Sequence, residues 1–170
     1  MTSLVVLVLS GILIAYTYIG YPLLLRLSVR LRGARYEPPA LLMDEQCPSV
    51  AILICAHNES DRIGKKIENC LSQDYPGEKL RIVIVSDGCT DSTNDQVLAY
   101  SNKNVTLVEN PARSGKATCL NLGMEKIDED VVILADVRQR LSRDAARRLV
   151  SHFEHPDIAA VSGELRFETS

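Results

Sequence analysis

Five short apolar runs, separated by stretches with helical periodicity, limit the fold of this chain more than any other feature. Continuous rather than alternating hydrophobicity is typical of strands buried on both faces, as in a parallel sheet. We therefore expect an α/β fold of the doubly wound, Rossmann-like type, with a mostly parallel sheet and helices packed on it. The runs lie at residues 50–55, 80–85, 105–108, 131–135 and 158–161. The helical stripes comprise Ile63, Ile67, Cys70 and Leu71; Ala117, Leu120, Met124 and Ile127; and Leu149, Val150 and Phe153.

The segment from Leu4 to Leu25 contains no charged residue. As a helix its 22 residues would be about 33 Å long, which matches the hydrocarbon core of a bilayer. Arginines follow the segment between residues 26 and 35, and no basic residue precedes it. A cleaved signal peptide is the alternative, but it would carry its basic residues before the apolar run. The positive-inside rule therefore predicts a single-pass helix in the cytoplasmic membrane, with the globular domain in the cytoplasm and the lipid bilayer as a partner.

This pattern divides the chain into three expected parts. Residues 1–35 form the transmembrane anchor with a basic juxtamembrane segment, 36–48 form a proline-containing linker, and 49–170 form the globular domain. The net charge of −3 argues against a nucleic-acid partner. The five cysteines include no CxxC pair and the three histidines have no zinc spacing, so we expect free thiols in a reducing compartment.

Polar clusters follow four of the predicted strands. They read AHNES, SDGCTDST, NPARSGKAT and DVRQ, and each begins where its strand ends. Ligands of open parallel sheets bind beyond the carboxyl ends of the strands. The sequence therefore predicts one composite site for a polar, phosphorylated ligand.

Two common nucleotide motifs are absent from these clusters. NPARSGKAT contains Gly115-Lys116, but a P-loop would need a glycine at Asn110 and a serine or threonine at Ala117. The loop after the first strand has no GxGxxG pattern, which argues against a dinucleotide fold of the usual type.

Five ordered segments instead resemble the inverting family 2 glycosyltransferases, which have the GT-A fold. The resemblance extends from about Pro48 to Gly163. It implies a glycosyltransferase of the hexosyltransferase type that uses a nucleoside-diphosphate sugar, with a UDP-sugar as the expected donor. The membrane-proximal YIGYPLLL resembles members that build exported polysaccharide or lipid-linked sugars, so we expect a sugar polymer or a lipid-linked acceptor at the cytoplasmic membrane face. The matching segments are ILICAHNESDRI, IVIVSDGCTDST, NPARSGKATCLNLGM, VVILADVRQRLSRDAARRLV and IAAVSG.

The first two polar clusters supply candidate contacts to the nucleotide. The Asp87 carboxylate only accepts hydrogen bonds and could accept one from the N3–H of uracil. Alternatively, Asp87 could simply begin a turn with Gly88. Glu59 could orient the base or ribose, or be a charge favoured at a helix start. His57, beside Ala56 in the same loop, could stack on the base. Asp91 is different, since it opens a helix and is better explained as a helix cap.

The third cluster opens a helix, where backbone N–H groups and the helix dipole favour anions. The amides around Ser114 and Gly115 are therefore candidate phosphate contacts. The family resemblance places Lys116 beside the nucleotide. Arg113 could contact phosphate or be a solvated charge.

Asp136 aligns with the first acid of the family's D-x-D metal motif. A hard cation, Mg²⁺ or Mn²⁺, takes oxygen ligands, and one protein carboxylate plus substrate oxygens can suffice. Position 138 holds an arginine, which cannot bind a cation but could pair with a phosphate or with a carboxylate elsewhere. The alternative is that Asp136 satisfies nearby backbone N–H groups while Arg138 and Arg140 are solvated.

The family's catalytic base and its QxxRW acceptor motif do not appear before Ser170. We expect the base beyond that residue and read the chain as the donor-binding part of a truncated glycosyltransferase. Two alternatives stay open: a non-catalytic, membrane-anchored nucleotide-sugar binder, and an unrelated flavodoxin-like interaction module.

Overall fold

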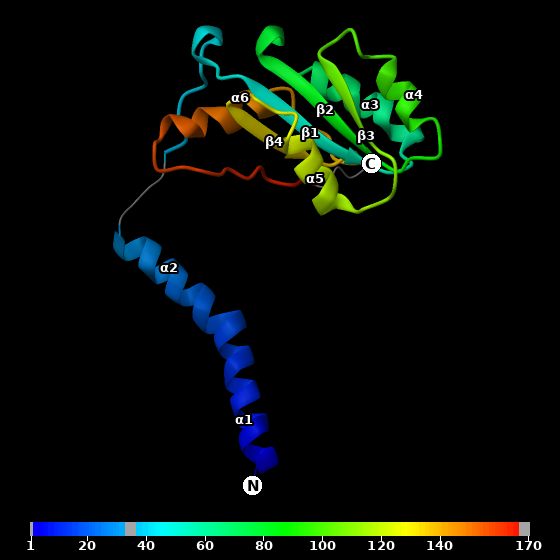
Figure 1. The fold of residues 1–170 in the computed structure, drawn as a ribbon. Coiled ribbons are helices and arrows are strands. Elements are labelled where there is room, and N and C mark those ends of the chain that lie inside the picture. The colour runs from blue at the N-terminus through cyan, green and yellow to red at the C-terminus, as the bar shows by residue number, and fades with distance from the viewer. Residues whose placement is uncertain (1, 33–36, 167–170) are drawn as a thin grey trace. The chain divides into compact units, whose positions relative to one another are not determined.

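The computed structural model describes residues 2–32 and 37–166, and the chain divides into two compact units at the Pro38–Pro39 boundary. The first unit is one continuous apolar helix, made of α1 (Thr2–Ala15), a π-helical turn (Tyr16–Gly20) and α2 (Tyr21–Arg32). The π-helical turn lies just before Pro22, which has no N–H to donate into the helix. At this turn the N–H of Tyr21 bonds to the carbonyl of Tyr16, five residues back, as in a π-helix. Figure 1 shows the helix bending at this turn.

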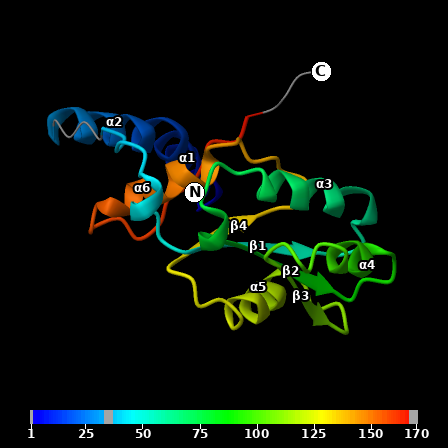
Figure 2. The ribbon, with the colours of Figure 1, turned by 90° about the horizontal axis from the view of Figure 1, so that it is seen from above.

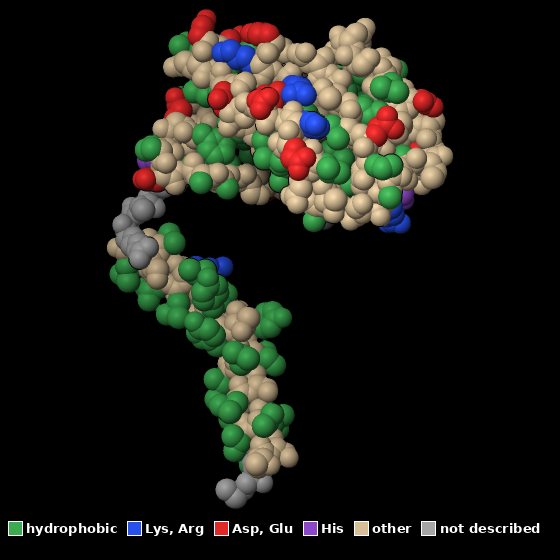
Figure 3. Space-filling view, viewed as in Figure 1, with side chains coloured by type: hydrophobic (Ala, Val, Ile, Leu, Met, Phe, Trp, Pro, Cys, Tyr) green, Lys and Arg blue, Asp and Glu red, His purple; other side chains and the backbone are tan. Residues whose placement is uncertain are grey.

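By length and composition, the helix Thr2–Leu31 is able to cross a membrane. Its large apolar side chains are exposed, and Figure 3 shows them covering the visible face of the helix. A signal sequence would satisfy the same criterion, so retention as an anchor stays a prediction.

The second unit is built on a parallel four-stranded sheet (Figure 1). Its strands lie in the order β3-β2-β1-β4, and all three pairings are parallel. Val50 at the start of β1 pairs with Leu80 of β2 and Val131 of β4, so the strands begin in register. The predicted doubly wound α/β architecture is confirmed. The strands are β1 (Val50–Ala56), β2 (Leu80–Asp87), β3 (Val105–Asn110) and β4 (Val131–Ala135).

Helices cover both faces of this sheet, and Figure 2 shows α3 and α4 on one side and α5 on the other. Ile52 and Ile84 belong to the core that includes residues of α3, α4 and α6. Leu53 and Val83 point the other way and pack with Cys119 of α5. Full burial of each such side chain stabilises the fold by about 1.5–3 kcal/mol. The helices are α3 (Ser60–Leu71), α4 (Thr93–Leu98), α5 (Lys116–Met124) and α6 (Ala145–Ser151), with 3₁₀ turns at Asp44–Gln46, Gly77–Lys79 and His152–Glu154.

Helix α5 packs on the sheet through a different face from the one expected. Cys119 and Gly123 are buried, whereas Ala117 and Met124 of the expected stripe are exposed. A Cβ atom at Gly123 would lie 2.4 Å from Leu53 Cδ1, so the absence of a side chain lets the helix approach β1 closely. The stripe prediction was right for Leu120 and Ile127, which pack against the core, and wrong for Ala117 and Met124, because the closest contact is made by small residues.

The expected fifth strand at 158–161 is also absent, and that prediction is wrong. Residues 155–166 form no strand, and Ala159 and Ala160 are exposed. Alanine buries little apolar area and is a poor strand former, so this run gains little by joining a sheet. Among the described residues no strand pairs with the outer edge of β4, where Leu134 is 61% exposed.

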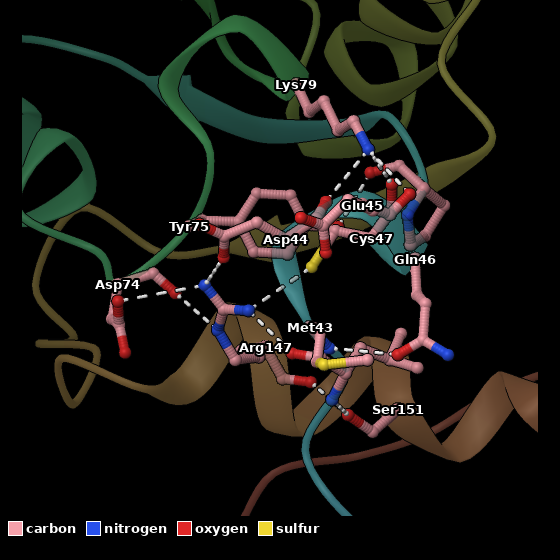
Figure 4. A network of polar contacts seen from close by, with 12 residues as sticks. Met43, Asp44, Glu45, Gln46, Cys47, Asp74, Tyr75, Lys79, Arg147 and Ser151 are labelled. Atoms are coloured by element: carbon pink, nitrogen blue, oxygen red, sulfur yellow. Dashed lines mark hydrogen bonds and ion pairs between the residues drawn. The ribbon is translucent and has the colours of Figure 1, made fainter.

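Much of the expected linker is part of the globular unit. Leu42 and Cys47 are buried, and Arg147 of α6 donates hydrogen bonds to the Leu42 carbonyl and to Asp44 Oδ1, both at 2.6 Å. Lys79 Nζ donates to three carbonyls of the same segment, including that of Cys47 at 2.9 Å (Figure 4). The described residues 39–47 are therefore tied to the domain, whereas the sequence predicted a linker over 36–48.

Candidate active site

A cleft of about 350 Å³ lies at the carboxyl ends of β1 and β4. It brings together five of the residues predicted from the sequence, although they come from three different loops. The remaining predicted residues, Ala56, Asp87, Gly115 and Lys116, lie in the same loops or beside them. The cleft is lined by Cys55, His57, Glu59, Arg113, Asp136, Val137 and Arg138.

His57 is held by the neighbouring strand. Its Nδ1 lies 2.6 Å from the backbone carbonyl of Asp87, and because a carbonyl can only accept, Nδ1 donates this hydrogen bond. The side chain is half-buried rather than fully exposed. Ala56 is buried, and its carbonyl accepts a contact from Cys89 Sγ at 3.5 Å. Both residues therefore link the ends of β1 and β2 and fix the floor of the cleft.

Asp87 holds the loop that follows β3. Its Oδ1 accepts the N–H of Ser114 at 2.7 Å and the amide of Asn110 at 3.0 Å, and its Oδ2 accepts the N–H of Gly115 at 2.9 Å. The N–H of Ser114 is the largest cause that lowers the pKa of Asp87 from 3.8 to about 2. The Asp87 carboxylate therefore occupies the N–H groups of Ser114 and Gly115. These two groups are not available to a phosphate, although the sequence predicted them as phosphate contacts.

The turn after Asp87 also has the predicted form. Gly88 has a φ of +61°, and a Cβ atom there would lie 2.6 Å from the backbone nitrogen of Arg113. A glycine is therefore required for the β2 and β3 loops to touch. The contact of Asp87 with uracil stays a prediction.

Asp91 acts as a cap, as predicted. Its Oδ1 accepts the N–H of Thr93 at 3.0 Å at the start of α4, and its Oδ2 accepts the N–H of Ser60 at 3.2 Å at the start of α3. The hydroxyl of Thr93 is the largest cause that lowers the pKa of Asp91 to about 2. One carboxylate thereby closes two helix N-termini beside the cleft.

Glu59 and Arg138 form an ion pair across the cleft, 79 residues apart in sequence. Glu59 Oε1 accepts hydrogen bonds from Arg138 Nε at 3.2 Å and Nη2 at 3.0 Å, while Oε2 accepts one from Arg62 at 3.1 Å. The Glu59 side chain is only 11% exposed, whereas that of Arg138 is 70% exposed. Of the two partners expected for Arg138, the structure shows the carboxylate.

Asp136 lies at the end of β4 and also has partners. Its Oδ1 accepts the N–H of Arg138 at 3.0 Å, and its Oδ2 lies 3.5 Å from Lys116 Nζ. The Arg138 N–H is the main cause that lowers the pKa of Asp136, and Lys116 adds to it. Within residues 2–32 and 37–166, no three His, Cys, Asp or Glu side chains are grouped to hold a metal ion. Of the two carboxylates that line the cleft, Glu59 is paired with Arg62 and Arg138, which leaves Asp136 as the one that could take a cation, and Asp136 faces Lys116.

The model of the family described as "Glycosyl transferase family 2" matches residues 51–169. The chain belongs to this family. Its four-stranded parallel sheet with flanking helices is the Rossmann-like GT-A fold that the motifs predicted.

Family 2 relatives with curated names include enzymes of polymer and of lipid synthesis. The chain is 30% identical over 138 residues to poly-β-1,6-N-acetyl-D-glucosamine synthase of Staphylococcus aureus, covering 80% of this chain and 33% of the relative. It is 32% identical over 143 residues to β-monoglucosyldiacylglycerol synthase of Synechocystis, covering 79% of this chain and 30% of the relative. The chain thus spans about a third of the length of the curated relatives it matches.

Solved structures to which the chain is similar include the mannosyltransferase PcManGT from Pyrobaculum calidifontis, in complex with GDP-mannose and Mn²⁺. It matches with a TM-score of 0.70 and 27% identity, over 86% of this chain and 44% of that one. S. aureus TarS in complex with UDP matches with a TM-score of 0.59 and 19% identity, over 62% of this chain and 32% of that one, and supports the fold alone.

Proposed function

We propose that this chain supplies the donor-binding part of a glycosyltransferase that uses a nucleoside-diphosphate sugar, with a UDP-sugar as the preferred donor. The observation that carries the proposal is the cleft at the carboxyl ends of β1 and β4, which gathers His57, Glu59, Arg113, Asp136 and Arg138 from separate loops. Ligands of open α/β sheets bind in this position. GDP-mannose in PcManGT supports a nucleotide-sugar donor of this class.

The loops position the groups that a donor needs. Asp87 fixes the Ser114–Gly115 turn, and this turn sets the start of α5 and the position of Lys116. The positively charged side chains of Lys116 and Arg113 then contact the diphosphate, whose negative charge increases as the sugar leaves. His57 Nε2 and the uncommitted acceptor sites of Asp87 serve the base and ribose.

A divalent cation is a further part of the proposal. Mn²⁺ accompanies GDP-mannose in PcManGT, and Asp136 is the described residue that would hold Mg²⁺ or Mn²⁺ here. Such an ion, when bound, stabilises charge on the leaving diphosphate. With Asp136 as its single protein ligand, the other ligands would be phosphate and water oxygens.

The acceptor is proposed to be a sugar polymer or a lipid-linked sugar at the cytoplasmic face of the membrane. Relatives named for a polysaccharide and for a glycolipid support these two classes. The apolar helix Thr2–Leu31 supports attachment to the membrane. The arginines between residues 26 and 35 support an orientation with the globular unit on the cytoplasmic side.

Donor binding is tested by calorimetry on the full chain in detergent micelles, with UDP, GDP and UDP-N-acetylglucosamine in the presence of Mn²⁺. We expect UDP to bind, and Lys116→Ala to weaken binding by about tenfold, because one charge-assisted contact is lost. Lys126→Ala removes an exposed lysine that does not line the cleft and is the matched control, with no expected change. Absence of binding by every nucleotide would refute the proposal and favour an interaction module.

The non-catalytic nucleotide-sugar binder remains the second candidate. It is favoured by the single carboxylate offered to a metal and by the Glu59–Arg138 ion pair across the cleft. Incubation with radiolabelled UDP-sugar distinguishes the two: release of free sugar or product indicates an enzyme, whereas binding without turnover indicates a binder.

A further inference from the structure

The cleft is lined with cationic side chains at the place where family 2 enzymes are expected to hold a metal ion. Arg138 stands where the second acid of the D-x-D motif would be, and Lys116 Nζ lies 3.5 Å from the first acid, Asp136. Arg113 lines the same cleft. A divalent cation bound to Asp136 would lie close to two of these positive charges, and like charges at such distances repel each other.

The ion pairs leave Arg138 able to change its partner. Nε and Nη2 both bond to one oxygen of Glu59, and no hydrogen bond from Nη1 is found within the described ranges. The Arg138 side chain is 70% exposed, so it can turn without disturbing the core. A guanidinium presents its donors as a planar fork that fits two oxygens of a diphosphate.

Glu59 would not be left without a partner by this exchange. Its second oxygen already accepts a hydrogen bond from Arg62 at 3.1 Å, so the nearly buried carboxylate keeps one cation when Arg138 turns away. Asp136 likewise keeps the backbone N–H of Arg138 when Lys116 moves to a phosphate. Arg138 in the cleft and Lys116 beside it can therefore change partner to a ligand, while Glu59 and Asp136 each keep one hydrogen-bond donor.

We propose that Arg138, together with Lys116, neutralises the donor diphosphate enough for the nucleotide to bind without a metal ion, so that the cation proposed for Asp136 is not required for binding. This inference rests on the proposed function, because it concerns the same donor site. A metal ion held by Asp136 then adds little to nucleotide affinity.

The test measures UDP binding to the full chain in detergent micelles by calorimetry, once with EDTA and once with Mn²⁺. For the unaltered chain, we expect dissociation constants that agree within about threefold between the two conditions. Arg138→Gln should weaken binding in EDTA by about 10- to 100-fold, because a charged hydrogen-bonded contact is lost. Arg138→Asp restores the D-x-D pattern, and its binding should become dependent on Mn²⁺.

Arg140→Asp is the matched control. Arg140 lies two residues further along the same loop. It lines the groove beside α3, which Arg138 also lines, but it does not line the cleft, so its replacement should change the dissociation constant by less than about twofold. Far-ultraviolet circular dichroism of each variant checks that it is folded.

Three results would overturn the inference. If UDP binds the unaltered chain only with Mn²⁺, the inference fails and the proposed function stands. If Arg138→Gln binds UDP in EDTA as tightly as the unaltered chain, Arg138 is not the neutralising group. If UDP, GDP and UDP-N-acetylglucosamine all fail to bind in both conditions, the proposed function fails and the inference fails with it.

Discussion

Replacing Asp87 with asparagine is expected to destabilise the globular unit because Asp87 is a carboxylate surrounded by donors. Its two oxygens accept the N–H groups of Ser114 and Gly115 and the side-chain amide of Asn110. An asparagine can offer one oxygen to Ser114, but its own NH₂ group then faces the N–H of Gly115. Two donors then face each other, and at least one part-buried N–H loses its partner.

The expected cost follows from these contacts. Hydrogen bonds to a charged group contribute about 1.5–3 kcal/mol each, and leaving a buried donor unsatisfied costs about 1–3 kcal/mol. We expect Asp87→Asn to lower the free energy of unfolding by about 2–3 kcal/mol. Asp128→Asn alters an exposed aspartate in the loop before β4 and should change stability by less than about 0.5 kcal/mol.

The same contacts predict a pH dependence. The pKa of Asp87 is lowered from 3.8 to about 2 in the folded chain, so the folded state favours the charged form. The resulting stabilisation is present above the unfolded pKa of 3.8 and is lost as the pH falls toward 2, with a total of about 2 kcal/mol. The stability difference between the unaltered chain and Asp87→Asn should therefore shrink between pH 5 and pH 2.

Urea unfolding in detergent micelles, followed by far-ultraviolet circular dichroism at pH 7, 5, 4 and 3, measures both effects. If Asp87→Asn lowers the free energy of unfolding at pH 7 by no more than Asp128→Asn does, the Ser114–Gly115 turn does not depend on the Asp87 carboxylate. A difference that stays constant from pH 7 to pH 3 would refute the assignment of the lowered pKa to Asp87.

Two further substitutions test how the globular unit is packed. Arg147→Ala removes the buried guanidinium that ties residues 42–47 to α6. Urea unfolding should show that it lowers the free energy of unfolding by about 2–4 kcal/mol. The control Arg148→Ala alters an exposed neighbour and should lower it by less than about 0.5 kcal/mol. Gly123→Ala places a Cβ atom 2.4 Å from Leu53 Cδ1 and should lower the melting temperature through about 1–3 kcal/mol of overpacking, although alanine is the better helix former. Gly77→Ala meets nothing within 4 Å and is the control for it. An Arg147→Ala chain as stable as Arg148→Ala, or a neutral Gly123→Ala, would contradict the packing described.

Strand positions and the side of the sheet that carries the site were predictable from the sequence. Continuous apolar runs report burial on both faces, and four of the five runs are strands. The run at 158–161 failed because hydrophobicity does not show whether a neighbouring edge is present or whether two alanines gain enough by joining it. The stripe in α5 was only half right for a related reason, since the close contact at Gly123 depends on small size, which a hydrophobic pattern does not record.

The candidate residues were predictable as a group but not as partners. Topology places the four polar clusters at the carboxyl end of the sheet, and residues of three of them line the cleft. The ion pair of Glu59 with Arg138 joins positions 79 residues apart, and no local pattern indicates it. The amides at Ser114 and Gly115 looked free in the sequence because the carboxylate that occupies them comes from another strand.

The outer edge of β4 has a practical consequence for work on this chain. Its five residues present backbone donors and acceptors that no other described strand engages, and Leu134 adds an exposed apolar side chain beside them. An edge of this kind is a template on which a second polypeptide can add a strand, and it favours aggregation at high protein concentration. Light scattering at increasing concentration, compared between the unaltered chain and Leu134→Lys, would show whether this edge controls the colloidal behaviour of the purified protein.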